Sequence, residues 1–588
     1  MKNKSNIAIN FKNRLKVGDK FIRWYIIITV LIFILRFLPL VFNYGAEHDS
    51  AWYLGLAKNL AHKGIYASST NTVAYEGEGS FPSIHNKFSV QDKEGYVYFP
   101  AGVTVGPSYI VPQAILLAIF GDGWLQYRLW PLISFSLFLG LIFFLTYRLG
   151  GITSLVILQI WLWFLPQLSV NFVFEAFSEH LALLFVLSAL LFCEKAIKTK
   201  QKKWFWFTGL FFSFAFLTKN LYLLNILVLV PIALFEIIQI IGNTNNKTVK
   251  KSNNLNVSAP FNNLKLQLFK NFIVQWLLVA VGFSLPIIVF EGYKLIFLLE
   301  KFGIESWFAV NREIQMTYQI SGSGIDTLKK CLFDEKLFMS KFKIWYDIGL
   351  YQYQLMWSVF FLLPILLFAQ KTNRLILYFL YSAALLSFLW FVLLSPLGWG
   401  RHIFHSLIIS IILFSVTIGR MFTMKGSLIK IAGLTAAIFL LLNIVTLPKS
   451  TPALTITDKD IDTWFSFREE RGIQGFPFAA LVPIQEQKTV IAFFANNIRP
   501  QDRVYYLDAF VLADISALTD KILFPISRFD NLQKSGQKNK GISYLMLGPY
   551  QLTKYKLVGD NYFQKAEEKC EQTVFKNEHY FICRLKTK

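Results

Sequence analysis

A short polar cluster follows the first hydrophobic segment of the chain. Glu47 to Tyr53 read Glu-His-Asp-Ser-Ala-Trp-Tyr, directly after twenty mostly apolar residues, Trp24 to Asn43. An apolar segment of this length predicts a membrane-spanning helix. Asp49 would then lie at the membrane interface, where partial shielding from water favours a general base acting on a lipid-borne substrate. The alternative is a carboxylate that only marks the end of the span.

The composition predicts a polytopic α-helical membrane protein. The 588 residues are 54% hydrophobic and 17% aromatic, and the mean hydropathy is +0.44. No soluble core needs so much apolar surface. About eleven spans are expected, at 24–43, 129–147, 151–168, 180–196, 204–218, 221–241, 271–297, 353–369, 375–395, 403–419 and 427–447.

Basic residues predict the direction of these spans. The first 23 residues contain seven Lys and Arg residues and a single Asp, so the N-terminus should stay in the cytoplasm. Every later loop expected on that side is also basic: 147–148, 195–203, 242–270, 371–374 and 420–425. Counting the short apolar segment 107–121 as a crossing would move the lysine-rich loop 195–203 outside. We therefore interpret 107–121 as interfacial or re-entrant, within a first outer loop at 44–128.

The composition changes at about residue 448. Residues 1–447 are expected to form the membrane domain, and 448–588 a small extracytoplasmic α/β domain. Strands are predicted at 504–507, 542–547 and 579–583, and a helix at 489–497. The Asn- and Ser-rich segment 242–263 is predicted to be a disordered linker. The net charge of +23 is spread over separate loops, which argues against a nucleic-acid partner and favours anionic membrane lipids.

Two of the four cysteines could form a disulfide. Cys570 and Cys583 flank a predicted hairpin in the outer domain, where an oxidising compartment would permit pairing. Cys193 and Cys331 have no evident partner, and the alternative is that all four are unpaired.

Several short motifs, in order along the chain, resemble those of GT-C fold glycosyltransferases. Asp49 is followed by Tyr53 and Ala57, and later in the same loop an aromatic-Pro-x-Gly segment begins at Phe99. Arg128-Leu129, Ser178-Glu179, Leu217-Thr218-Lys219 and Gly400-Arg401-His402 then stand at ends of predicted spans. The resemblance is to the bacterial branch related to protein O-mannosyltransferases and the lipid A aminoarabinose transferase.

The resemblance implies transfer, with inversion, from a polyprenyl-phosphate-linked sugar to an acceptor on the outer face of a bacterial inner or plasma membrane. Asp49 would be the general base, and Glu179 would orient the acceptor or Asp49. A phosphate leaving group requires a fixed cation. Arg401 is the first candidate for this cation, followed by Lys219 and Arg128.

The substrate cavity is expected to include His48, Tyr53, Tyr98, Pro100 and His402. No His pair has metal-ligand spacing, so no metal is assigned, although a divalent cation could assist. The acceptor could be a glycan, a lipid or a protein. A lipid-linked glycan ligase or polymerase is an open alternative. A lipid-sugar transporter fits less well, because the charges lie at span ends and no repeat is visible.

Overall fold

The computed structural model describes most of the chain. The described residues are 20–45, 48–70, 89–100, 106–164, 178–251, 259–320, 373–394, 400–424, 482–507, 513–519, 521–526, 541–549 and 562–586, with short pieces between 426 and 438 and single residues at 529, 532 and 552. The predicted span 353–369 and residues 448–481 of the predicted C-terminal domain lie outside them. Most of the predicted span 427–447 does too.

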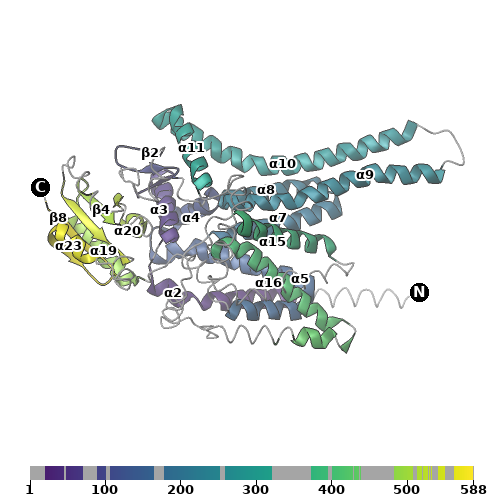
Figure 1. The fold of residues 1–588 in the computed structure, drawn as a ribbon, viewed down its shortest axis with the longest axis horizontal. Helices are drawn as coiled ribbons and strands as arrows, with labels where there is room; N and C mark the ends of the chain where they lie inside the picture. Colours follow the sequence, from purple (N-terminus) through teal and green to yellow (C-terminus); the bar gives the residue numbers. More distant parts are fainter. Residues whose placement is uncertain are drawn as a thin grey trace.

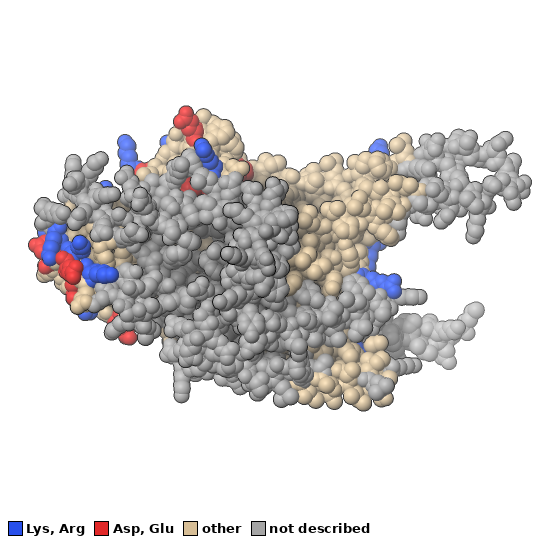
Figure 2. Space-filling view, in the orientation of Figure 1, with Lys and Arg blue, Asp and Glu red and all other residues tan. Residues whose placement is uncertain are grey.

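Long helices run along the long axis of the molecule, and a β-sheet lies at one end (Figure 1). Six helices among the described residues are long and apolar enough to cross a membrane: Trp124–Trp163, Glu179–Thr199, Asn220–Ile238, Leu266–Phe302, Arg374–Phe391 and Phe404–Thr423. On the face shown in Figure 2, charged side chains lie mainly near the two ends. The side of α10 on the same face is largely uncharged. These features confirm a polytopic helical membrane protein, while the count of eleven spans stays a prediction.

Several predicted spans correspond to helices. Helix α5 (Trp124–Phe164) covers two of them, because it breaks at Gly151, whose φ of 79° is left-handed. Two further predicted spans correspond to α7 (Glu179–Thr199) and α8 (Lys202–Thr218), and others to α15 (Arg374–Leu394) and α16 (Gly400–Thr423). The apolar segment predicted to be interfacial is α4 (Pro107–Phe120), with 14 residues. At about 1.5 Å per residue, α4 is too short to cross.

Two expectations differ from the structure. The predicted span 221–241 begins as a 3-10 helix, η2 (Asn220–Leu229), before α9 (Val230–Lys251). Pro231 cannot donate to the carbonyl of Leu227, so an uninterrupted α-helix is disfavoured there. The linker predicted to be disordered at 242–263 is largely helical, since α9 continues to Lys251 and α10 (Ala259–Phe302) begins at Ala259. Extending a helix that already exists avoids the cost of nucleation.

The first span is interrupted at a buried cation. A helix over residues 20–35 ends in a turn at Arg36, and α2 (Leu38–Asn43) follows. Arg36 is buried, donates from Nη1 to the Trp163 carbonyl at 2.5 Å, and lies 4.5 Å from the centre of the Trp163 ring. The carbonyl and the ring stabilise the guanidinium charge where water is scarce.

The C-terminal sheet has five strands in the order β5-β4-β6-β8-β7. Strand β4 (Arg503–Leu507) is parallel to β5 (Leu523–Ile526) and β6 (Ser543–Leu547), and β8 (Phe581–Leu585) is antiparallel to β6 and to β7 (Cys570–Lys576). Helices α19 (Ile484–Asn497), α20 (Ala513–Thr519) and α23 (Tyr562–Lys569) pack with it. The α/β character of this region therefore agrees with the prediction.

Close packing of α8 on α10 depends on two glycines. A Cβ on Gly209 would lie 1.9 Å from the Val279 carbonyl oxygen, and one on Gly282 would lie 2.3 Å from the Trp206 carbonyl oxygen. Both contacts are with backbone, which cannot move aside without shifting a helix.

We expect Gly209→Val to destabilise the protein by about 1–3 kcal/mol, because the two helices must separate. Thermal unfolding in detergent measures the effect. Gly140→Ala in α5 is the matched control, since its added Cβ would meet no atom within 4 Å. Equal melting temperatures for Gly209→Val and wild type would contradict the packing argument.

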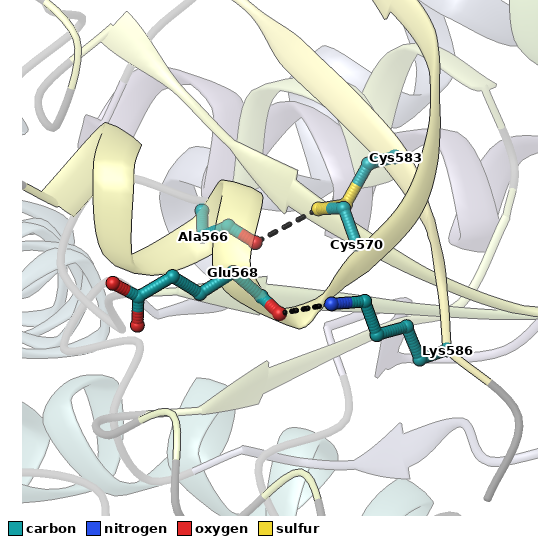
Figure 3. Close-up of a disulfide and its surroundings, with 5 residues drawn as sticks. All are labelled: Ala566, Glu568, Cys570, Cys583 and Lys586. Atoms are coloured by element: carbon teal, nitrogen blue, oxygen red, sulfur yellow. Dashed lines mark hydrogen bonds between the residues drawn. A yellow bond between two sulfur atoms is a disulfide. The ribbon is translucent and has the colours of Figure 1, made fainter.

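The predicted disulfide between Cys570 and Cys583 is present. It joins β7 to β8, with 5.7 Å between the Cα atoms (Figure 3). Nearby, Lys586 Nζ donates to the Glu568 carbonyl at 2.9 Å, which ties the end of the sheet to α23. Both contacts fix the last hairpin of the chain.

Because the bond closes a short loop, its removal in a Cys570→Ser/Cys583→Ser variant should cost about 3 kcal/mol in the chain-entropy model. Denaturant unfolding with and without reductant measures this difference. Thiol alkylation of the unfolded wild type before and after reduction counts the bonded cysteines. Full labelling of both cysteines before reduction would contradict the disulfide.

Candidate active site

Helix α3 (His48–Lys63) contains the predicted base in its first turn. The backbone places His48 and Asp49 as its first two residues, and their side chains lie outside the described part. A helix N-terminus favours a carboxylate in this position. Tyr53, one turn further on, is buried, and its ring lies 5.5 Å from that of Tyr109 in α4.

Polar contacts from several directions hold α3. Asn59 donates from Nδ2 to the Ala67 carbonyl at 2.7 Å and to Ser69 Oγ at 3.0 Å. The buried Lys58 donates from Nζ to the Ala517 carbonyl of α20 at 2.9 Å and lies 3.4 Å from Asp122 Oδ2. The helix with the candidate base is therefore fixed both to its own loop and to the C-terminal region.

A buried ion pair joins two membrane helices at the same end. Glu179 is the first residue of α7, and Lys219 follows the last residue of α8 in an extended conformation. The two side chains form a hydrogen-bonded ion pair, and both residues are buried. Tyr222 Oη donates to the Glu179 carbonyl at 3.2 Å. This pair is adjacent to α4, since Gly106 N donates to the Thr218 carbonyl at 3.0 Å.

Arg128 and Tyr109 complete this cluster. Arg128, buried on α5, donates from Nη2 to the carbonyl of Gly45, four residues before Asp49. Tyr109 is fully buried, and its charge environment includes Arg128 and Glu179. Burial raises the pKa of the Tyr109 hydroxyl, so this hydroxyl keeps its proton. Among the described residues it has no hydrogen-bond partner.

The first turn of α16 contains Arg401 and His402. Their side chains lie outside the described part, so the predicted phosphate role of Arg401 stays a prediction. One turn later, His405 is buried and stacks on Tyr222 with 4.6 Å between ring centres. This contact places the start of α16 beside the segment that holds Glu179.

Tyr98 and Pro100 were expected to line the cavity. Tyr98, in β3 (Val97–Tyr98), is buried, and its hydroxyl donates to Asp92 Oδ2 at 2.7 Å and contacts Lys301 of α10. Tyr98 thus attaches the first loop to α10, and its role in the cavity stays a prediction. Pro100 is half-buried, and its role in the cavity stays a prediction.

Tyr109, Tyr222 and His405 were not among the predicted site residues. Each lies within an apolar helix, where a single aromatic or His residue is usually a core residue. Tyr109 had the clearest signal, since it follows the Gly106-Pro107 break directly.

Glu313 is a second buried carboxylate on the same side as α3. It lies on α11 (Ile304–Ile320), between the predicted spans 271–297 and 353–369, and Ser89 Oγ donates to its two oxygens at 2.6 and 2.8 Å. Burial raises the pKa of Glu313 to about 7, although the Ser89 hydrogen bonds oppose the change. The Glu313 carboxylate therefore titrates near neutral pH.

This pKa predicts a pH-dependent stability. The unfolded carboxyl releases its proton near 4.5, while the folded one holds it to about 7. The folded state binds more protons between these values, so stability should fall by about 3 kcal/mol as pH rises from 4.5 to above 7. Glu313→Gln should remove this part of the pH dependence.

Melting temperatures of wild type and Glu313→Gln between pH 5 and 8 measure the difference. Glu305→Gln is the control, because Glu305 is exposed on the same helix. Parallel pH profiles for wild type and Glu313→Gln would contradict the raised pKa.

The chain is similar to several known proteins. Residues 105–255 match the family model described as "Dolichyl-phosphate-mannose-protein mannosyltransferase". The matched segment includes Arg128, Glu179 and Lys219 and excludes Asp49 and Arg401. The match confirms the predicted resemblance and the predicted enzyme class, a GT-C-type glycosyltransferase. No curated protein matches the chain.

Solved structures also align along most of the chain. ArnT from Cupriavidus metallidurans bound to undecaprenyl phosphate is 14% identical over 95% of this chain and 96% of that one, with a TM-score of 0.48. Its apo form is 13% identical over 97% and 98%, with a TM-score of 0.49. The archaeal oligosaccharyltransferase AglB from Archaeoglobus fulgidus, in complex with an inhibitory peptide and a dolichol-phosphate, is 12% identical over 96% and 74%, with a TM-score of 0.45.

Proposed function

We propose that this glycosyltransferase moves a sugar from a polyprenyl-phosphate donor to a hydroxyl or amine on the outer face of the membrane, with inversion. The family model that matches residues 105–255 is named for a dolichyl-phosphate-linked mannose donor, and this supports the donor class. The observation on which the proposal mainly rests is the convergence of the α3 N-terminus with Arg128, Glu179 and Lys219 at one end of the helix bundle.

Asp49 acts as the general base in this proposal. It takes the proton from the acceptor as the acceptor oxygen or nitrogen attacks the anomeric carbon and the bond from that carbon to the phosphate oxygen breaks. The Arg128 contact with the Gly45 carbonyl supports this role, because it fixes the backbone that leads into α3. Positioning of this kind determines how often the base and the acceptor meet in a reactive geometry.

The leaving polyprenyl phosphate gains negative charge and needs cations beside it. Arg401 stays the first candidate, since α16 begins next to the segment containing Tyr222. Lys219 is the second, and Glu179 holds it in place when no donor is bound. Arg128 is the third, because its guanidinium already holds the Gly45 carbonyl.

Asp49→Asn tests the proposal, since it keeps the side-chain shape and removes the ability to accept a proton. Transfer should fall by about 10²–10⁴, with unchanged donor binding and melting temperature. The measurement uses purified protein, synthetic undecaprenyl-phosphate-mannose and undecaprenyl-phosphate-aminoarabinose, and cell-envelope extract as acceptor. Release of undecaprenyl phosphate is followed with time.

Two further variants make the result specific. Glu571→Gln should keep full activity, because Glu571 is an exposed carboxylate of β7 that pairs with Arg584 at 3.4 Å. Glu179→Gln should lose less transfer than Asp49→Asn but should melt earlier, since it removes the negative charge that is paired with the buried Lys219. Full transfer by the Asp49→Asn protein would remove Asp49 as the base.

A further inference from the structure

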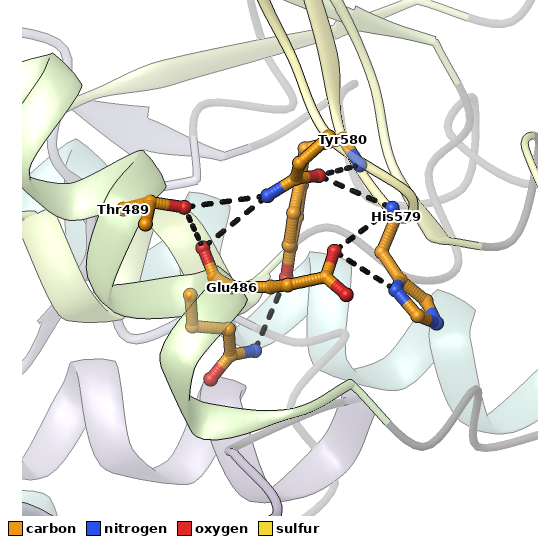
Figure 4. Close-up of polar contacts among 6 residues, drawn as sticks. Glu486, Thr489, His579 and Tyr580 are labelled. Carbon is orange, nitrogen blue, oxygen red and sulfur yellow. Dashed lines mark hydrogen bonds and ion pairs between the residues drawn. The ribbon is translucent and has the colours of Figure 1, made fainter.

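A group of three potential metal ligands lies in the C-terminal region, apart from the candidate active site. Glu578 and His579 stand in the turn between β7 and β8, and Glu486 stands in the first turn of α19. One ligand atom from each residue lies within 4.8 Å of the other two. His579 Nδ1 is 3.0 Å from Glu486 Oε2, which also accepts the backbone N–H of His579 at 3.1 Å (Figure 4).

The fold fixes the turn that presents these ligands. Asn577 Oδ1 accepts the backbone N–H groups of His579 at 3.1 Å and Tyr580 at 2.7 Å. Asn577 Nδ2 reaches across to α19, where it donates to Thr489 Oγ1 at 3.4 Å. The imidazole and the Glu486 carboxylate are therefore held against each other before any ion arrives, which lowers the cost of binding.

The charges in this cluster are not balanced by the protein. Among the residues that the structure describes, His579 is the single cationic partner of Glu486, and only when protonated. Among the described residues, the carboxylate of Glu578 has neither a hydrogen bond nor an ion pair. With a neutral imidazole, the cluster has two negative charges and three ligand atoms, which one divalent cation would neutralise.

We propose that Glu486, Glu578 and His579 form a binding site for a divalent transition metal of the zinc class, with Nδ1 of His579 and one oxygen of each carboxylate as ligands. A mixed nitrogen and oxygen set favours Zn²⁺ and its neighbours over Mg²⁺ or Ca²⁺, which prefer oxygen alone. Water would complete the coordination.

The cluster lies close to the contact between α19 and the segment that leads into α3, so a bound metal would affect that contact. Helix α19 follows Val482 and Pro483, whose backbone meets the membrane domain. Gly45 N donates to the Val482 carbonyl at 3.0 Å, and Tyr44 pairs with Pro483. A Cβ on Gly45 would lie 1.7 Å from Gln487 Oε1, so α19 and this segment are in close contact. A metal bound to Glu486 would join the β7–β8 turn to the helix that touches the approach to α3.

Zinc titration of the full-length protein in detergent tests the site. The protein is purified with an affinity tag that lacks histidine, stripped with EDTA and dialysed. Calorimetry with Zn²⁺ should show one saturable site, and zinc should raise the melting temperature. Co²⁺ should give a visible absorption band from a coordinated ion.

Variants identify the ligands. His579→Asn and Glu578→Gln should each weaken zinc binding on the order of 10- to 100-fold, the range reported for loss of even an outer-shell partner. Glu578→Gln is the decisive variant, because the Glu578 carboxylate is exposed and makes no hydrogen bond or ion pair within the described part of the chain. Glu567→Gln, an exposed carboxylate of α23, should bind as wild type does. His62→Ala should also bind as wild type, which shows that the other histidine–carboxylate contact, with Asp122, is not the site.

Failure of wild type to bind Zn²⁺ saturably would overturn the proposal. Undiminished binding by both Glu578→Gln and His579→Asn would also overturn it. None of these readouts depends on glycosyl transfer, so the site and the proposed function can fail separately.

Discussion

A charge buried among membrane helices must find its counter-charge or a polar backbone group inside the protein, because lipid offers neither. The pair of Glu179 with Lys219 meets this requirement and fixes the start of α7 against the end of α8. Arg36 meets it with the carbonyl and ring of Trp163, and Arg128 meets it with the carbonyl of Gly45. Each solution ties together segments far apart in sequence, so the position of α3 follows from where these charges are satisfied.

The C-terminal sheet takes part in the same arrangement. Backbone and side-chain contacts join it to the first loop at Gly45, at Lys58 and at Ser69, whose carbonyl accepts the Leu523 N–H at 3.2 Å. Helix α3 therefore lies between the membrane helices and the sheet, and it makes contacts on both sides. The C-terminal sheet and its helices therefore help to hold the helix that contains the candidate base.

Local patterns were sufficient to predict most helices. Apolar segments bounded by basic residues predicted α7, α8, α15 and α16, and the short segment predicted to be interfacial or re-entrant is the 14-residue helix α4 (Pro107–Phe120). The 3-10 turn at Asn220–Leu229 was missed because hydropathy does not register how a helix is wound. Strand β5 was missed since its local signal is weak and it is stabilised by its neighbour in the sheet, whereas β7 lies within the hairpin predicted between Cys570 and Cys583.

The sequence predicted individual residues of the candidate site, but not the contacts between them. Asp49, Glu179, Lys219 and Arg128 could be named from short motifs at span ends, but their partners could not. The Arg128 contact with Gly45 joins residues 83 positions apart, and the ion pair of Glu179 with Lys219 joins residues 40 positions apart. Such contacts depend on the packing of several helices, and no local period in the sequence records them.

The hydrogen bond from Lys58 to the Ala517 carbonyl also determines when, during synthesis, α3 can reach its final contacts. The two residues are 459 positions apart, so a ribosome adding about 5–20 residues per second makes Ala517 roughly 20–90 s after Lys58. During that interval α3 is already outside the ribosome without the helix that will cover it. The Lys58 ammonium cannot make this bond before α20 has been synthesised, so α3 reaches its final environment well after its own residues have been made.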